Sequence, residues 1–334
     1  MFNSVTFFYI KIFYIFTEKM KNPNQKTRSF LNRLGVYFTE RFPILLYFPF
    51  VVILYFCLSF LTQILSKNEP FIDSGSFVGI ASIFFMMLLI RTFDDLKDVA
   101  LDHEIFPNRP VSRGAVLIGD VKFLAIFSFF ILVVINVLFA QRTLFIFTIM
   151  MVYALLTFKW FFAEKLHIEN PKIAMVTHQP LPIVIIFFMI HTALALGVNY
   201  DRFTKYHFYV LLLFALPITA WEVSRKIKAK VNENKYETFS KIFGIKIAVC
   251  IPIILYTVAG IISMLIANEL NFHYLFYITI IGYLLFLNYN FIRFLINPIP
   301  KNNNLQKVAM TFTSLLFITT MCFLLLKYSI KIDL

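Results

Sequence analysis

The sequence has 334 residues, of which 60% are hydrophobic and 15% charged, and its net charge is +13. Soluble domains carry about 25% charged residues, so this composition, with a mean hydropathy of +0.78, excludes a soluble globular protein. The basic residues lie between apolar blocks and form no single basic face, which excludes nucleic-acid binding as the reason for the positive charge.

The apolar residues form blocks of about 20 residues, the length that a helix needs to cross a bilayer. They predict an all-α, polytopic transmembrane helical bundle of about nine spans. We expect one transmembrane domain over residues 43–330, preceded by a cytoplasmic lead over residues 1–42. In that lead, either an interfacial helix lies before Met20 or translation starts at Met20. The spans are expected at residues 43–65, 75–93, 121–140, 143–162, 173–197, 207–225, 246–267, 273–296 and 308–330.

The distribution of Lys and Arg predicts the orientation. Of the 31 Lys and Arg residues, 25 fall in the lead and in or beside the loops that follow even-numbered spans. Because cytoplasmic loops carry the excess of these residues, we expect the N-terminus in the cytoplasm and the C-terminus outside. The protein is then a multi-pass protein, and we expect it in a bacterial inner membrane.

Four aspartates, Asp94, Asp95, Asp98 and Asp102, follow the second span. If its helix continues, their carboxylates lie within an arc of about 100°. Like charges at this spacing destabilise a helix unless a cation neutralises them. Magnesium takes carboxylate oxygens and keeps positions for substrate phosphates. The cluster therefore predicts magnesium held against a diphosphate; the alternative is a solvated charged surface.

Two other polar groups lie on the same predicted side. Arg109 and Arg113 belong to a loop with two prolines and a glycine, and offer forked donors for phosphate oxygens; the alternative is positive-inside anchoring. Glu222 ends a long apolar block, where an ionisable group is costly and usually functional. Lys226 lies one turn further on, so an ordinary surface Glu–Lys pair is the alternative.

These motifs resemble those of the UbiA-type intramembrane prenyltransferases. The first family motif, Asn-Asp-x-x-Asp-x-x-x-Asp, is similar to Asp94-Asp95-Leu-Lys-Asp98-Val-Ala-Leu-Asp102, with Asp in place of the leading Asn. The family's Arg-Pro-x-x-x-Gly element matches Arg109-Pro110-Val-Ser-Arg113-Gly114, and Lys159 matches a family lysine near the end of span four. The nine-span count agrees, so the resemblance covers most of the chain.

The resemblance implies a transferase of prenyl groups, Mg²⁺-dependent, that moves a (poly)prenyl group from a prenyl diphosphate to a lipophilic acceptor within the lipid bilayer. We expect the acceptor to be aromatic, and we expect no nucleic-acid partner. Aromatic faces such as Tyr153 can stabilise the allylic cation. The implied metal ligands are Asp94, Asp95, Asp98, Asp102 and Glu222; the implied catalytic residues are Asp95, Asp98, Lys159 and Lys226; the implied substrate-binding residues are Arg109, Arg113, Tyr153 and Arg225.

The second family motif, Asp-x-x-x-Asp, is altered to Glu222-Val-Ser-Arg225-Lys226. We expect Lys226, with Arg225, to contact the diphosphate in place of a second magnesium ion, and Glu233 to substitute as a ligand if the helix runs on. A transporter or metal permease, and a non-catalytic family member, stay as alternatives. A CDP-alcohol phosphotransferase is excluded, because its glycine- and arginine-containing aspartate motif is absent from the sequence.

Overall fold

The computed structural model describes residues 29–195, 203–233 and 238–332, and in them nine helical segments are long and apolar enough to cross a membrane. The predicted nine-span bundle is confirmed, whereas the expectations for the chain before Met20 lie outside the described residues. The spanning helices are α3 (Ile44–Leu65), α4 (Ser74–Lys97), α6 (Ile118–Phe139), α7 (Leu144–Phe158), α9 (Pro171–His178) continued by α10 (Leu181–Ala195), α11 (Lys205–Arg225), α13 (Ile245–Glu269), α14 (Tyr274–Ile296) and α15 (Leu305–Lys327).

Shorter elements connect these helices. They are α2 (Phe30–Glu40), α5 (Val99–Ile105), α8 (Glu164–Glu169), α12 (Phe239–Phe243), and the two-residue strands β1 (Phe71–Ile72) and β2 (Lys331–Ile332), which pair in parallel. The chain divides into two compact units. Unit 1 comprises Met1–Tyr47 and Met87–Phe129, and unit 2 comprises Phe48–Met86 and Phe130–Leu334. Each unit is described by itself.

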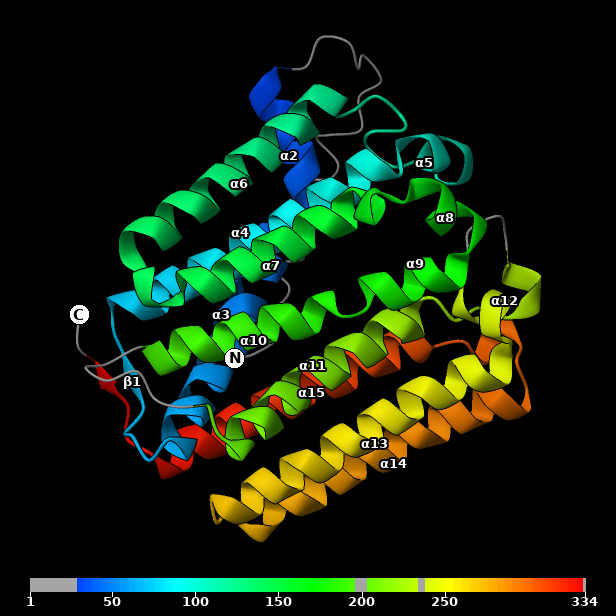
Figure 1. Cartoon of the computed structure of the whole chain (residues 1–334). Helices are drawn as coiled ribbons and strands as arrows, with labels where there is room; N and C mark the ends of the chain where they lie inside the picture. The colour runs from blue at the N-terminus through cyan, green and yellow to red at the C-terminus, as the bar shows by residue number, and fades with distance from the viewer. Residues whose placement is uncertain (1–28, 196–202, 234–237, 333–334) are drawn as a thin grey trace, which may run out of the picture. The chain divides into compact units, whose positions relative to one another are not determined.

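In unit 2 the helices pack as neighbouring rods. Figure 1 shows α10, α11 and α13 side by side, and α11 also contacts α15. The fully buried Tyr256 of α13 donates its hydroxyl hydrogen to the carbonyl oxygen of Ala309 on α15 at 3.2 Å. Asn136 Nδ2 of α6 donates to Ser82 Oγ of α4 at 2.8 Å. Such polar contacts join helices in an apolar solvent that competes little for them.

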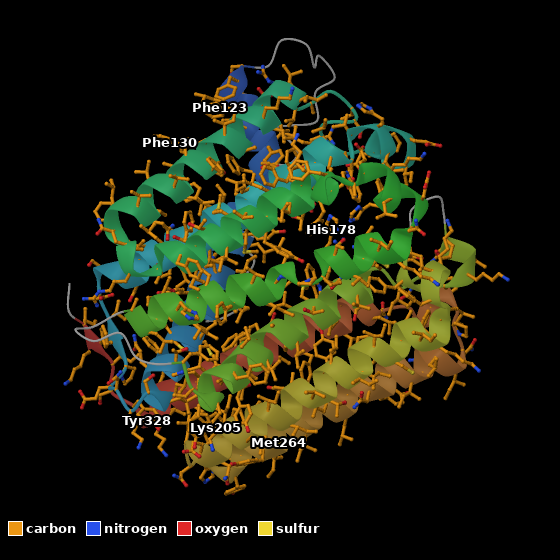
Figure 2. The ribbon with its side chains drawn as sticks, viewed as in Figure 1. Phe123, Phe130, His178, Lys205, Met264 and Tyr328 are labelled. Carbon is orange, nitrogen blue, oxygen red and sulfur yellow. The ribbon has the colours of Figure 1, made fainter. Side chains whose placement is uncertain are left out.

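The outward faces of the helices are apolar. Phe130 of α6, drawn in Figure 2, is 61% exposed, and Leu45 of α3 and Leu326 of α15 are more exposed still. In water such surfaces would drive aggregation, but hydrocarbon is as apolar as these side chains. The exposed apolar surface therefore fits a helical bundle surrounded by lipid.

Unit 1 is held together by polar contacts at its described N-terminal helix. Ser29 caps α2, its hydroxyl accepting from the Asn32 N–H at 3.4 Å. Arg33 of α2 donates from Nε to Asp120 Oδ2 at 2.7 Å, and that carboxylate also accepts the Leu117 N–H at 2.9 Å. These contacts fix α2 against the first turn of α6, which positions Arg41, the residue after α2, for the contacts described below.

Candidate functional site

The acidic cluster lies where α4 ends and α5 begins. Asp98 separates the two helices, with φ −98° and ψ 14°, so the prediction of one continuous helix through Asp102 is wrong. The Asp98 and Asp102 N–H groups still donate to the carbonyl oxygens of Asp94 and Asp98, at 3.0 and 2.7 Å. Asp94 and Asp95 therefore belong to one helix and Asp102 to another, with Asp98 at the bend.

Asp95 is bound by two arginines. Its side chain is 2% exposed; it accepts from Arg41 Nε at 3.3 Å and makes a second, shorter contact with the same guanidinium. Arg91, one turn earlier on α4, lies 3.3 Å from the same carboxylate. Burial, and after it the charge of Asp95, raises the pKa of the nearby Tyr37 phenol. Because a buried carboxylate is costly unless it is paired, Asp95 joins the end of α2 to the last turns of α4.

Asp102 is bound by an arginine of the following loop. Arg109 donates to Asp102, and the guanidinium carbon of Arg109 lies 3.8 Å from the centre of the Phe106 ring. Arg113 binds Glu40 of α2 and the Asn108 carbonyl oxygen. The loop predicted to bind phosphate is therefore folded back on α2 and α5, and its arginines are held by charge and by a cation–π contact.

A depression of about 340 Å³ lies on this part of unit 1. Arg41 and Arg109 both line it, and each also binds an aspartate of the cluster. A guanidinium has five N–H donors, so an arginine that binds one carboxylate can also donate to a phosphate. The lining residues are Glu40, Arg41, Ile105, Phe106, Pro107, Asn108, Arg109 and Pro110.

The two remaining aspartates differ in their surroundings: Asp94 is exposed and Asp98 half-buried. Across the described ranges, no three His, Cys, Asp or Glu side chains converge as a preformed metal centre. Magnesium is usually bound by one or two carboxylates together with water and substrate phosphates, rather than by an all-protein cage. The donors present, Asp94 and Asp98, fit that kind of site.

Asp98 is expected to make magnesium binding depend on pH. Its pKa is raised to about 6, first by burial and then by the negative charge of Asp94. The charge of Asp102 adds to this increase, while the positive charges of Lys97 and Arg109 oppose it. Below that pKa a proton competes with the metal, so we expect the apparent magnesium dissociation constant to rise about tenfold for each pH unit of acidification.

Titration calorimetry with magnesium and geranylgeranyl diphosphate between about pH 5 and 7 tests this expectation. The diphosphate itself also titrates at about pH 6, so part of the pH dependence comes from the substrate. The control is Asp98→Asn, which keeps the contribution of the substrate and lacks that of the Asp98 carboxyl group. The wild-type protein should show the steeper dependence on pH. Equal slopes in the two proteins would contradict the prediction.

In unit 2, Glu222 lies in the last turn of α11. Both Nε and Nη2 of Arg225 donate to its carboxylate, and Lys226 Nζ lies 3.2 Å from it. Pro217 lies inside the same helix, which ends at Arg225. The predicted second motif therefore forms a cluster of one acid and two cations. Metal binding by Glu222 stays a prediction, in which a metal ion must compete with these two cations.

Glu233 does not lie on the same helix as Glu222, because α11 ends eight residues before it. It follows a 3-10 turn over Lys230–Asn232, and its carboxylate accepts from Thr238 Oγ1 and Ser240 Oγ, each at 2.6 Å. The condition under which Glu233 was expected to substitute as a ligand, that the helix runs on, is therefore not met. These hydrogen bonds tie the Glu233 carboxylate to Thr238 and Ser240.

The segment around Lys159 contains a feature that the sequence did not indicate. Span four was expected to reach residue 162, but α7 ends at Phe158 and Lys159 follows it. The next three residues, Trp160–Phe162, have φ of 50°, 52° and 57°, a region that non-glycine residues avoid. Such strain persists only where the surrounding structure enforces it, and it is common at functional sites.

Ring contacts to this turn come from α8 and α9, and the His167 ring of α8 stacks on the Phe161 ring at 5.9 Å between centroids. The His178 ring, labelled in Figure 2, lies 5.4 Å from the Trp160 ring between centroids, and its Nε2 is 3.1 Å from the Thr157 carbonyl oxygen. Tyr153 donates its hydroxyl hydrogen to the Thr177 carbonyl oxygen at 2.7 Å. The hydroxyl of Tyr153 therefore joins α7 to α9, and its ring is half-buried.

Comparison with known proteins identifies the fold. No protein-family model matches the chain, and neither does any curated protein. Among solved structures, a digeranylgeranylglyceryl phosphate synthase matches with a TM-score of 0.62 at 16% identity, over 87% of this chain and 98% of that chain. A UbiA homolog from Aeropyrum pernix K1 matches with a TM-score of 0.59 at 14% identity, over 81% of this chain and 98% of that chain. The chain therefore has the UbiA-type prenyltransferase fold.

Proposed function

From this fold, we propose that the protein is a membrane-embedded prenyltransferase, which moves a prenyl group from a prenyl diphosphate to a lipophilic acceptor and needs magnesium. The observation that carries the proposal is the bend at Asp98. There, in unit 1 of a chain with the UbiA-type fold, two aspartates occur together with arginines whose guanidinium groups are able to donate to phosphate oxygens. The transporter, the metal permease and the non-catalytic member are not favoured by these observations.

In the proposed reaction the bond between the first prenyl carbon and the diphosphate oxygen breaks, and the electron pair leaves with pyrophosphate. The allylic cation is attacked by an electron-rich carbon or heteroatom of the acceptor, which then loses a proton. Magnesium, when bound, neutralises the charge that develops on the departing pyrophosphate. Asp94 and Asp98 are the residues proposed to hold it, and Arg109 and Arg113 are proposed to donate to diphosphate oxygens.

Asp95 has a different role in this proposal. Since Arg41 and Arg91 already neutralise its carboxylate, we assign Asp95 to holding α4 in place, which positions the neighbouring Asp94 and Asp98. Asp102 holds Arg109 in the same way. The cytoplasmic N-terminus, the external C-terminus and the bacterial inner membrane belong to the same proposal, on the distribution of Lys and Arg.

The experiment that tests the proposal uses the purified chain and a thiolodiphosphate analogue of geranylgeranyl diphosphate, in which transfer is blocked. We expect binding that requires magnesium, and no comparable binding of geranylgeraniol, which lacks the diphosphate. Labelled geranylgeranyl diphosphate added to membranes should then give labelled lipid products, identified by mass. Equal affinity for the analogue with and without magnesium would overturn the proposal.

A separate prediction concerns Lys226, whose expected contact with the diphosphate rests on the sequence resemblance. The Lys226→Asp variant restores the acid of the family motif, and removes a cation that lies 3.2 Å from Glu222. We expect it to bind one more magnesium ion per diphosphate than the wild-type protein does, because Glu222 then has an acidic neighbour. Magnesium titration followed by calorimetry measures this, with Lys228→Asp as the matched control. Unchanged stoichiometry and activity in Lys226→Asp would count against the prediction.

A further inference from the structure

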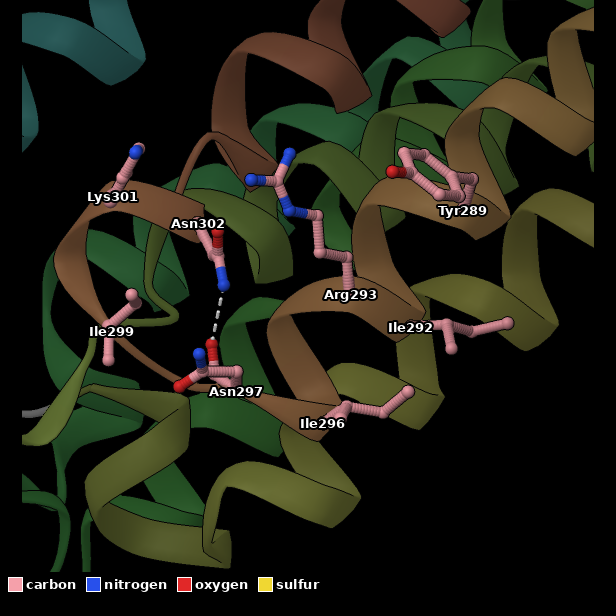
Figure 3. Close-up of a pocket in the computed structure, with 8 residues that line it drawn as sticks. All are labelled: Tyr289, Ile292, Arg293, Ile296, Asn297, Ile299, Lys301 and Asn302. Carbon is pink, nitrogen blue, oxygen red and sulfur yellow. Dashed lines mark hydrogen bonds between the residues drawn. The ribbon is translucent and has the colours of Figure 1, made fainter.

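A second depression, of about 530 Å³, lies in unit 2 where α14 ends and the chain turns toward α15. Figure 3 shows the side chains around it: the Arg293 guanidinium extends between Tyr289 on one side and Lys301 and Asn302 on the other. None of these residues belongs to the motifs discussed above. The lining residues are Tyr289, Ile292, Arg293, Ile296, Asn297, Ile299, Lys301 and Asn302.

The depression is positively charged. Arg293 and Lys301 both line it, and no Asp or Glu occurs in the sequence from residue 270 to residue 332. Nor is a carboxylate among the lining residues in the described part of the chain. The C-terminal end of a helix carries partial negative charge, so the end of α14 does not itself attract an anion. Binding of an anion here must come from the side chains.

Hydrogen-bond donors accompany the two cations. Asn302 Nδ2 donates to the Asn297 carbonyl oxygen at 2.9 Å, which fixes this amide at the edge of the depression (Figure 3). Tyr289, one turn before Arg293, is 63% exposed. A guanidinium presents its donors in a rigid fork that matches the geometry of phosphate oxygens, so this group of side chains is suited to a phosphate monoanion or diester.

The other side of the depression is apolar and faces outward. Ile292, Ile296 and Ile299 are 46%, 79% and 41% exposed, and in Figure 3 Ile292 and Ile296 extend away from the basic groups. They belong to or follow the last turns of a membrane-spanning helix, so this surface is at the depth where acyl chains meet headgroups. Tyrosine is itself enriched at that depth.

A charged head beside an apolar surface is the chemistry of a phospholipid. We propose that the depression at the end of α14 binds an anionic phospholipid, with its phosphate at Arg293 and Lys301 and an acyl chain along Ile292 and Ile296. Basic pockets between transmembrane helices bind anionic headgroups in this way. A zwitterionic lipid has no net charge, so the two basic side chains add little to its binding and it is bound less well.

The test is native mass spectrometry of the full chain in a non-ionic detergent, titrated with phosphatidylglycerol and with phosphatidylcholine of the same acyl chains. We expect tighter binding of phosphatidylglycerol. The variant Arg293→Gln/Lys301→Gln should weaken that binding about thirty-fold, since each basic residue near the membrane surface contributes about 1 kcal/mol. Binding of phosphatidylcholine should be unchanged.

The matched control is Lys246→Gln/Lys307→Gln, which removes the same charge from exposed residues of α13 and α15 that do not line the depression. It should weaken phosphatidylglycerol binding less than about threefold. Inorganic phosphate at millimolar concentration should not displace the lipid. The proposal is overturned if the control loses as much affinity for phosphatidylglycerol as the Arg293/Lys301 variant does, or if that variant binds phosphatidylglycerol as tightly as the wild-type protein. Equal binding of the two lipids, or displacement of the lipid by free phosphate, would also overturn it.

Discussion

Replacing Asp98 by asparagine is expected to lower magnesium-dependent binding of the prenyl diphosphate, and prenyl transfer, by about a hundredfold. An amide oxygen is a neutral and weaker ligand for a hard divalent cation than a carboxylate. A metal ion stabilises charge on a phosphate leaving group by several kcal/mol, and about 1.4 kcal/mol corresponds to each factor of ten. Losing one of the two proposed ligands should remove roughly half of such a contribution.

The same substitution should not destabilise the fold. Burial and the charge of Asp94 raise the pKa of Asp98 to about 6, well above its ordinary value of 3.8. When folding raises the pKa of a carboxyl group, ionisation of that group costs stability at every pH above its ordinary pKa. The loss of stability reaches its full size once the pH exceeds the pKa of the group in the folded state. At pH of about 7 a neutral asparagine removes that cost.

Asp98→Asn therefore separates function from stability. We expect it to unfold in detergent at an equal or higher denaturant concentration than the wild-type protein, while its magnesium-dependent affinity for the thiolodiphosphate analogue falls about a hundredfold. The control is Glu104→Gln, which makes the same acid-to-amide change at an exposed position of α5. Full binding by Asp98→Asn, or an equal loss in Glu104→Gln, would show that the ligand assignment is incorrect.

Replacing Arg41 by glutamine is expected to lower the free energy of unfolding by about 3 kcal/mol. Removing one partner of a buried ion pair typically costs 3–5 kcal/mol, because it leaves a buried charge uncompensated. Asp95 has 2% of its side chain exposed and Arg41 has 12%, so both charges are shielded from water. Arg91 remains beside Asp95 at 3.3 Å, which places the expected effect at the lower end of that range.

A double-mutant cycle makes the assignment testable. If Asp95 mainly holds α4 to the end of α2, Arg41→Gln/Asp95→Asn should recover most of the stability lost in Arg41→Gln alone, because the buried charge is then gone. Arg113→Gln is the control: its partner Glu40 is 38% exposed, and exposed pairs contribute at most about 1 kcal/mol. Denaturant unfolding of the purified chain measures the four proteins of the cycle (wild type, Arg41→Gln, Asp95→Asn and Arg41→Gln/Asp95→Asn) and the Arg113→Gln control.

The cycle also distinguishes the two roles proposed for Asp95. A metal ligand released from Arg41 would bind magnesium more tightly, so the magnesium affinity of the folded Arg41→Gln protein would rise. A residue that only positions α4 gives no such increase, and the affinity falls with the loss of order at the bend. We expect the second result, since Asp95 is already neutralised by two guanidinium groups.

The sequence by itself determined the membrane character, the number of spans and most of their ends. Those features depend on local length and hydropathy, because each helix must satisfy its own backbone hydrogen bonds in hydrocarbon. The predicted start of span seven at residue 246 and the observed Ile245 differ by one residue. The positions of the acidic cluster and of Arg109 relative to the second span are likewise set by residue order alone.

Only the tertiary structure decided which partners the aspartates of the cluster have. Arg41 pairs with Asp95 across 54 residues of sequence, and no local pattern indicates that contact. The bend at Asp98 and the left-handed turn over Trp160–Phe162 likewise lie where the sequence predicted a continuing helix. Hydrophobic length sets where a chain crosses a membrane, whereas the ionisation, pairing and exposure of a side chain depend on which distant residues fold against it.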